Sequence, residues 1–344
     1  MTSLVNRRAH CRGGRVRVYA VCIAVLVLTP FYVCAADEDI SEALEVVRAG
    51  IAHDALYAID MNAEKGVAVG NFGLILETAD SGATWTTTEP LTEQGLLGIA
   101  TAGDRQIIVG QAGTVLTRVG DAKWKKLDND IGLRLLNVDL HESGLVVAVG
   151  EFGAIQRSRD NGVTWEAITV DWAPYNEEGY EPHLYDVIIK DESTVVLVGE
   201  FGLILWSEDG GDTFTARHRG EESIFAIELD AEGTGTGYAV GQDGEVLRSN
   251  DAGLTWQRLK VGSNANLLGV WSGQGEVVIT GIRELLRSSD DGETWTRTDD
   301  IKVVRNWYQG VDAGVAEIEA PNGFLRTQIV YVVGHKATIS RILE

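Results

Sequence analysis

A four-residue turn of the form Gly-x-x-Gly recurs along this chain at nearly regular intervals. Five copies are complete and two are degenerate, and their first glycines are spaced 40, 40, 49, 42, 40 and 53 residues apart. These glycines are Gly70, Gly110, Gly150, Gly199, Gly241, Gly281 and Gly334. A period of this length indicates that the chain is built from seven copies of one supersecondary unit.

Each copy carries four short apolar segments. They are runs of β-branched, aliphatic or aromatic residues bounded by Gly, Asp and Asn, which is typical of strands and not of helices. Four strands in about 40–45 residues make one blade of a β-propeller. We therefore expect an all-β fold over residues 37–344: a single seven-bladed β-propeller of four-stranded antiparallel blades, closed so that few strand edges stay exposed.

A second motif, Ser/Thr-x-Asp-x-Gly-x-Thr-Trp/Phe, lies between the third and fourth strands of most copies. This is the Asp-box (BNR) pattern. Its carboxylate can accept backbone N–H bonds across a turn, its Gly permits a positive φ, and its aromatic ring packs between sheets. Copy two keeps only a remnant, residues 120–124. The box aspartates are Asp80, Asp160, Asp209, Asp251 and Asp290, and the box aromatics are Trp85, Trp165, Phe214, Trp256 and Trp295.

The seventh copy stops after its third strand, at the end of the chain, and has neither an Asp box nor a fourth strand. Residues 41–48 precede the first copy at the spacing of a fourth strand. We expect this segment to pair with the C-terminal strand and close the ring. A short surface helix is the alternative, because Ser41 is followed by Glu, Ala and Leu.

Two insertions interrupt the repeat, at residues 171–183 and 313–328. The up-and-down order of strands puts 171–183 on the face of the Gly-x-x-Gly turns, while 313–328 lengthens the loop between the first and second strands of copy seven. Trp172, Tyr175 and Tyr180 in the first insertion are candidates for partner contact, since aromatic side chains favour interfaces. The alternative is that they pack the insertion onto its own blade.

Polar residues occupy the second position of most Gly-x-x-Gly turns and form a ring on that face. One interpretation is a polar rim that receives a peptide, with Glu151 and Glu200 as contact residues; the other is simple turn chemistry. Arginine also recurs at one third-strand position, where it can bind carboxylates in two-point geometry or bridge neighbouring blades. These arginines are Arg157, Arg248, Arg287 and Arg341.

The N-terminal 36 residues have the form of a secretory signal. Five arginines precede an apolar stretch at 18–33, and small residues then lead into an acidic segment. We expect cleavage near Ala36 and export to a periplasmic or thylakoid-lumen-like compartment; an uncleaved anchor helix is the alternative. All three cysteines (Cys11, Cys22 and Cys34) lie in this leader, so the mature domain has no disulfide or thiolate chemistry.

The formal net charge of −22 makes nucleic-acid binding and adsorption to an anionic membrane unfavourable. The six histidines are scattered, which indicates neither a metal site nor a bound cofactor. Nucleophile elbows, His-Glu-x-x-His and phosphate loops are missing, and so is the Arg-Ile-Pro signature of sialidases. The sequence thus favours a binding protein over an enzyme, with an Asp-box glycosidase or a carbohydrate-binding propeller as the alternative.

The combined repeat, Val-Gly-x-x-Gly-x-Ile/Leu-x-x-Ser-x-Asp-x-Gly-x-Thr-Trp, resembles the photosystem II stability/assembly factor family and its bacterial relatives over about residues 56–344. The resemblance implies a monomeric, non-enzymatic factor that docks on a membrane protein complex, either photosystem-like or an envelope transporter. It also implies that the arginines of the repeats form the binding patch.

Overall fold

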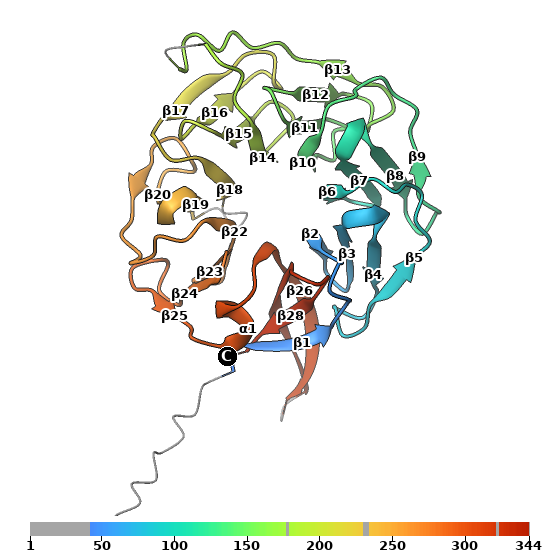
Figure 1. Ribbon diagram of the computed structural model, residues 1–344, viewed down its shortest axis with the longest axis vertical. Helices are drawn as coiled ribbons and strands as arrows, with labels where there is room; N and C mark the ends of the chain where they lie inside the picture. Colours follow the sequence, from blue (N-terminus) through green and yellow to red (C-terminus); the bar gives the residue numbers. More distant parts are fainter. Residues whose placement is uncertain (1–41, 177–178, 230–233, 321–322, 344) are drawn as a thin grey trace, which may run out of the picture. The chain divides into compact units, whose positions relative to one another are not determined.

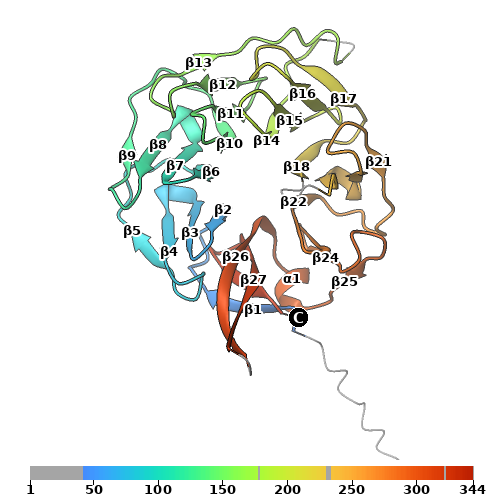
Figure 2. The ribbon, with the colours of Figure 1, turned by 180° about the vertical axis from the view of Figure 1, so that it is seen from behind.

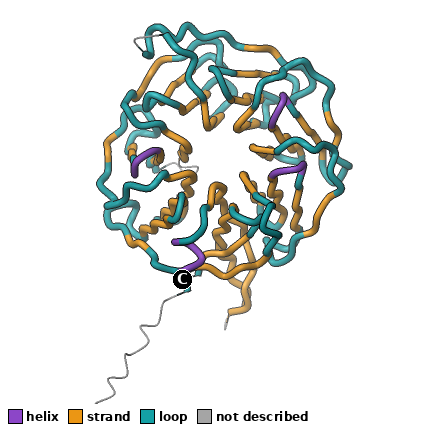
Figure 3. The backbone as a smooth tube through the Cα atoms, viewed as in Figure 1, coloured by secondary structure: helices purple, strands orange, loops and turns teal. Residues whose placement is uncertain are grey.

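The second strand of each blade is apolar on both faces, so its sheet must be covered on two sides. In β3 (Lys65–Gly70), Val67 and Val69 pack toward one neighbouring sheet while Ala68 packs toward the other. Sheets of this kind stack face to face until the last meets the first. The result is a ring of seven four-stranded sheets whose first strands surround the centre (Figures 1 and 3).

A computed structural model describes residues 42–176, 179–229, 234–320 and 323–343, which lie in one compact unit, Ile40–Glu344. The leader and its cleavage site, Ser41, and residues 177–178 and 321–322 of the two insertions lie outside the described residues. No helix among those described is long and apolar enough to cross a membrane.

Every blade is a four-stranded antiparallel sheet, and the predicted seven-bladed fold is confirmed. Blade 1 is β2 (Leu56–Asn62), β3, β4 (Ile75–Thr78) and β5 (Thr86–Thr88); blade 2 is β6 (Leu96–Ala102), β7 (Arg105–Gly110), β8 (Val115–Val119) and β9 (Lys125–Lys126). Blade 3 is β10 (Leu135–Leu140), β11 (Val146–Gly150), β12 (Ile155–Ser158) and β13 (Glu166–Ala167); blade 4 is β14 (Leu184–Ile189), β15 (Val195–Gly199), β16 (Ile204–Ser207) and β17 (Thr215–His218). Blade 5 is β18 (Ile224–Leu229), β19 (Gly237–Gly241), β20 (Val246–Ser249) and β21 (Gln257–Arg258); blade 6 is β22 (Leu267–Gly273), β23 (Glu276–Gly281), β24 (Glu284–Ser288) and β25 (Thr296–Arg297).

Blade 7 joins the two ends of the described chain. Its strands are β26 (Tyr308–Ala320), β27 (Gly323–Gly334), β28 (Ile339–Ile342) and, as the outer strand, β1 (Leu44–Arg48). β1 pairs antiparallel with β28, from Leu44 opposite Ile342 to Arg48 opposite Ile339. The predicted closing strand is therefore confirmed, and the helical alternative is wrong for residues 44–48.

The core is divided among the interfaces between neighbouring blades. Each buried apolar cluster draws its residues from two adjacent sheets, as where Val147 of blade 3 meets Leu197 of blade 4. The other six clusters are built the same way. Burial between blades supplies the main stabilisation, so a side chain is constrained chiefly by the neighbouring repeat.

The insertion in copy seven forms strand, where the sequence predicts only a longer loop. β26 and β27 continue far beyond the length of the other inner strands and project past the ring as a hairpin (Figures 1 and 2). Contacts with blade 1 hold its base. Val315 donates its N–H to the carbonyl of Ala63 at 3.1 Å, and its carbonyl accepts from Ser81 Oγ at 2.6 Å.

Candidate functional site

The Asp-box turns have the geometry that their residue types predict. In blade 3, Asp160 Oδ1 accepts the Thr164 N–H at 2.8 Å and Oδ2 accepts the Thr164 hydroxyl at 2.7 Å. Ser158 Oγ donates to Asp160, and Trp165 donates its indole N–H to the Gly162 carbonyl. These hydrogen bonds, led by the Thr164 N–H, lower the pKa of Asp160 to about 2. The box aspartates and aromatics are therefore structural.

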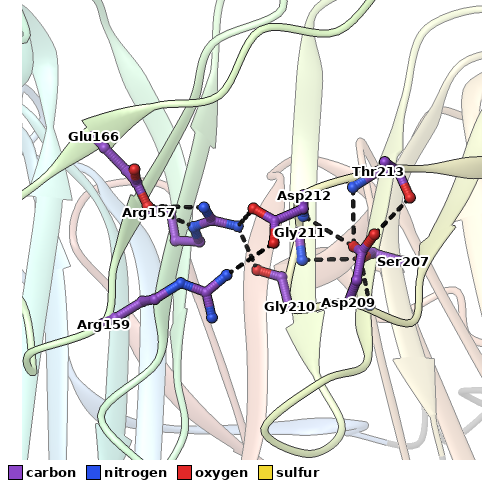
Figure 4. Close-up of polar contacts among 9 residues, drawn as sticks. All are labelled: Arg157, Arg159, Glu166, Ser207, Asp209, Gly210, Gly211, Asp212 and Thr213. Atoms are coloured by element: carbon purple, nitrogen blue, oxygen red, sulfur yellow. Dashed lines mark hydrogen bonds and ion pairs between the residues drawn. The ribbon is translucent and has the colours of Figure 1, made fainter.

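The four recurrent arginines share one register position, as predicted, and pair within the protein. Arg157 is the most deeply placed, with its side chain only 6% exposed. It bonds Glu166 at 2.8 Å in its own blade and Asp212 at 2.7 Å in the Asp box of blade 4, and it donates to the Gly210 carbonyl at 2.9 Å (Figure 4). This guanidinium connects two blades, which is the structural alternative that the sequence left open.

The remaining three arginines have similar partners. Arg248 pairs with Glu293 of the next blade at 2.6 Å. Arg287 pairs with Glu276 at 2.7 Å, and Arg341 pairs with Glu45 of the closing strand at 2.5 Å. Their side chains are 17%, 30% and 42% exposed, so exposure rises toward the closing blade. Binding of a partner by these arginines stays a prediction, and it would have to compete with the acids that already hold them.

The insertion 171–183 lies on the Gly-x-x-Gly face, as its topology predicts. Trp172 is buried beneath it and passes so close to Gly153 that a Cβ there would lie 2.7 Å from the indole nitrogen. Tyr175 is half-buried and donates its hydroxyl to the Phe214 carbonyl at 2.7 Å. Trp172 and Tyr175 thus fasten the insertion to its blade, while Tyr180 is 65% exposed and free to meet a partner.

The polar side chains at the second position of the Gly-x-x-Gly turns accept hydrogen bonds from backbone N–H groups. Asn71 Oδ1 accepts the Ala55 N–H at 2.8 Å, Glu151 accepts that of Arg134 at 3.0 Å, and Glu200 accepts that of His183 at 2.9 Å. Each bond secures the segment that leads into the inner strand. Turn chemistry therefore accounts for Glu151 and Glu200, and their contact with a partner stays a prediction.

The third residue of these turns shows a different feature. Phe72 and Phe152 have φ values of 54° and are 66% and 56% exposed. A bulky residue in the left-handed region costs on the order of 1 kcal/mol, and an exposed ring recovers little of this by packing. The same conformation occurs at Ala112 and Asp243 of the equivalent turns, so it belongs to the turn, and the exposed rings make these two phenylalanines candidates for contact with a partner.

A β-bulge in the inner strand of every blade lines the central channel near the same face. Pairing shifts by one residue after the first position of all seven inner strands. The seven bulge residues, all half-buried, form a mostly apolar collar in a channel of about 410 Å³. They are Tyr57, Leu97, Leu136, Tyr185, Phe225, Leu268 and Gln309. In the sequence, each of them is the second residue of the first apolar segment of its copy.

Aromatic contacts connect this collar to the exposed turns. Phe152 meets His183 edge-on with ring centroids 5.1 Å apart, and His183 lies 6.4 Å from Tyr185. Tyr185 in turn meets Phe225 at 5.0 Å. A continuous aromatic row thus runs from an exposed turn of blade 3 to the channel lining at blade 5. We define Phe72, Phe152, Tyr180 and the collar as the turn-face surface.

Carboxylates line the channel below the collar. Asp139 Oδ2 accepts the Ile189 N–H at 2.6 Å, and Asp312 Oδ2 accepts the Met61 N–H at 2.6 Å, so each ties its strand to the next blade. Burial raises the pKa of Asp60 to about 8 and that of Asp186 to about 7. Among the described residues, no group of histidines, cysteines and acids is arranged to hold a metal ion.

Fold and surface together define a closed seven-bladed β-propeller with exposed aromatic residues on the face of its Gly-x-x-Gly turns. The family described as "Photosynthesis system II assembly factor YCF48" matches residues 37–175 and 169–269, and the chain belongs to this family. No curated protein matches the chain.

Solved structures agree on the fold. A structure titled "YCF48 bound to D1 peptide" is 18% identical, with a TM-score of 0.66 over 88% of this chain and 96% of that one. YCF48 from Cyanidioschyzon merolae is 20% identical, with a TM-score of 0.67 over 87% and 98%. The Niastella koreensis GH74 enzyme is 16% identical, with a TM-score of 0.64 over 87% of this chain but only 53% of its own. At these identities the likeness concerns the fold alone.

Proposed function

We propose that this chain is a non-enzymatic, exported scaffold that holds a peptide segment of a membrane protein subunit while its complex assembles. Membership in the YCF48 family and the D1 peptide bound by a structurally similar YCF48 support this function. Within the molecule, the carrying observation is the pair of exposed phenylalanines in left-handed turns, Phe72 and Phe152. They present apolar surface at a cost in backbone strain, as a binding face does.

The partner class is a photosystem II subunit or, in a non-photosynthetic cell, a subunit of another envelope complex. The basic and apolar leader supports export to a periplasmic or thylakoid-lumen-like compartment with cleavage near Ala36. Mass spectrometry of the mature N-terminus tests the cleavage. A chain that keeps residues 1–36 in the membrane would contradict it.

The binding function is tested by crosslinking the tagged chain in cells and identifying the captured membrane subunit. The double variant Phe72→Asn and Phe152→Asn should capture it at least about tenfold less, because both apolar contacts are lost. Val163→Asn is the matched control, since Val163 is 71% exposed but lies in an Asp box on the opposite face. Equal loss in the control and the double variant would remove the turn-face surface from the function.

The glycosidase alternative is tested separately. The channel carboxylates Asp139 and Asp312 are engaged by backbone N–H groups of neighbouring blades, so they serve the structure. We expect no turnover on a panel of fluorogenic glycosides and sialosides. Turnover that Asp60→Asn abolishes would replace the scaffold function with hydrolysis.

A further inference from the structure

Asp boxes cover the blade before them, and one box atom repeatedly makes the contact. The carbonyl between the box Asp and Gly accepts a hydrogen bond from a side chain of the preceding blade. In blade 1 it is Ser81, which accepts from Tyr331 at 2.7 Å; in blade 6 it is Asp291, which accepts from Tyr238 at 2.7 Å. Similar carbonyl contacts in the described chain are Gly210 with Arg157, Ala252 with Lys190 and, at the C-terminal end, Leu343 with Arg287.

Blade 2 departs from this pattern. Arg118 stands at the register position of the box Ser or Thr, and the turn to Trp124 is one residue shorter than a full box. Arg118 reaches back to Glu77 of blade 1 at 2.7 Å and stacks on Trp124, whose indole N–H also donates to Glu77 at 2.7 Å. The box tryptophans donate instead to the glycine of their own turn. Blade 2 therefore has no Asp-box turn that covers the neighbouring surface of blade 1.

An open groove of about 730 Å³ results between blades 1 and 2. Val67 of blade 1 lines this groove. The residue of blade 2 at the same register position is Ile107, and there the Asp box of blade 3 covers it with Gly162. An ion pair between Lys65 and Asp121, 2.8 Å long and mostly exposed, lies at the edge of the groove. The groove has the location and polar walls of an unfilled box position.

We propose that this groove binds a turn of a partner polypeptide that carries Lys or Arg. Its two basic lining residues, Lys65 and Arg118, are neutralised by Asp121 and Glu77. Glu64 and Asp104, on the turns of blades 1 and 2 that border the groove, are exposed, and their side chains have no hydrogen-bond or ionic partner among the described residues. The walls thus favour a basic segment, whose backbone would take the position of the missing box. The groove opens on the Asp-box face, so this site is independent of the proposed turn-face surface.

The test is chemical-shift mapping of the isotope-labelled mature chain with two octapeptide probes. Both have the blade 5 box sequence, Ser249–Trp256; one carries Asn250→Lys and Leu254→Lys, the other Asn250→Glu and Leu254→Glu. We expect the lysine probe, and not the glutamate probe, to shift amides lining the groove at millimolar concentration. No shifts with the lysine probe, or shifts confined to other sites, would overturn the proposal.

Two variants locate the site. Glu64→Lys combined with Asp104→Lys should weaken the lysine probe at least about tenfold, because both unpaired carboxylates are reversed. Glu142→Lys is the matched control, an exposed acid on the corresponding turn of blade 3. Replacing residues 118–124 with the Ser249–Trp256 sequence should fill the groove and abolish binding while the fold is kept. If the double variant and the control bind alike, the groove is not the site, whatever the graft does.

Discussion

The carboxylate of Asp300 accepts a hydrogen bond from the backbone N–H of Leu44, 256 residues earlier in the chain, at 3.2 Å. The same carboxylate accepts the N–H of Ala43 at 2.8 Å and, as the N-cap of α1 (Ile301–Val304), that of Lys302 at 2.8 Å. Lys302 then donates to the Leu44 carbonyl at 2.7 Å. One buried acid thus positions the strand that closes the ring.

Asp300→Ala should therefore destabilise the whole domain, because it leaves three N–H groups without their acceptor: the buried one of Leu44 and the part-buried ones of Ala43 and Lys302. We expect a loss of about 2–4 kcal/mol in the free energy of unfolding. Urea denaturation followed by tryptophan fluorescence measures it. Asp299→Ala, at an exposed neighbouring residue, is the control and should change stability by less than about 0.5 kcal/mol. A midpoint for Asp300→Ala equal to that of the control would contradict this account of closure.

The buried Arg157 should contribute more to the stability of the domain than an exposed, ion-paired arginine does. Arg157→Met removes the guanidinium, so the Gly210 carbonyl loses its interblade donor and Asp212 keeps only its contact with Arg159 at 3.3 Å. We therefore expect a loss of about 2–3 kcal/mol. Arg326→Met removes an ion pair whose arginine is 74% exposed and should cost less than about 0.5 kcal/mol. The comparison is made by urea unfolding at one pH. Equal effects would mean that the buried bridge contributes no more than a surface pair.

The channel carboxylates should make the domain less stable as pH rises from about 4 to 8. Burial raises the pKa of Asp60 to about 8 and that of Asp139 to about 6, whereas unfolded carboxyls ionise near their ordinary pKa of about 4. The folded state therefore holds more protons than the unfolded state in this window, and stability is lost as they leave.

Asp60→Asn tests this dependence. We expect the free energy of unfolding of the parent to fall by on the order of 2 kcal/mol between pH 5.5 and 8, and that of the variant to fall less. Below about pH 4 the slope should reverse, since hydrogen bonds to Thr164 and Ser158 lower the pKa of Asp160. A parent whose stability rises steadily from pH 5.5 to 8 would show that the channel acids are ionised throughout.

Phe72→Asn should stabilise the protein while weakening its partner contact. Asn tolerates the left-handed conformation better than Phe does, and little packing is lost because the ring is 66% exposed. We expect a gain of about 0.5–1 kcal/mol by thermal or urea unfolding. Phe72→Ala removes the ring but keeps the strained backbone, so it should gain less. A clear loss of stability for Phe72→Asn would show that the ring serves the fold.

Local patterns determined most of the fold. The Gly-x-x-Gly spacing, the apolar runs and the Asp boxes each depend on residues within one repeat, so they could be interpreted without knowing what lies beside them. Even the closing strand followed from counting strands, because a ring with one strand missing has one place to take it.

Contacts between repeats decided the rest. Nothing near Arg157 in the sequence indicates that it meets Asp212 of the next blade, and the remnant box of blade 2 shows its consequence only once blade 1 lies beside it. The bulges that turn Tyr185 and its counterparts toward the channel are likewise a matter of strand pairing. Sequence alone set the number, order and turns of the blades, because short-range hydrogen bonding governs these. The pairing of charges, the aromatic surface and the open groove depend on packing between sheets, which joins residues tens of positions apart.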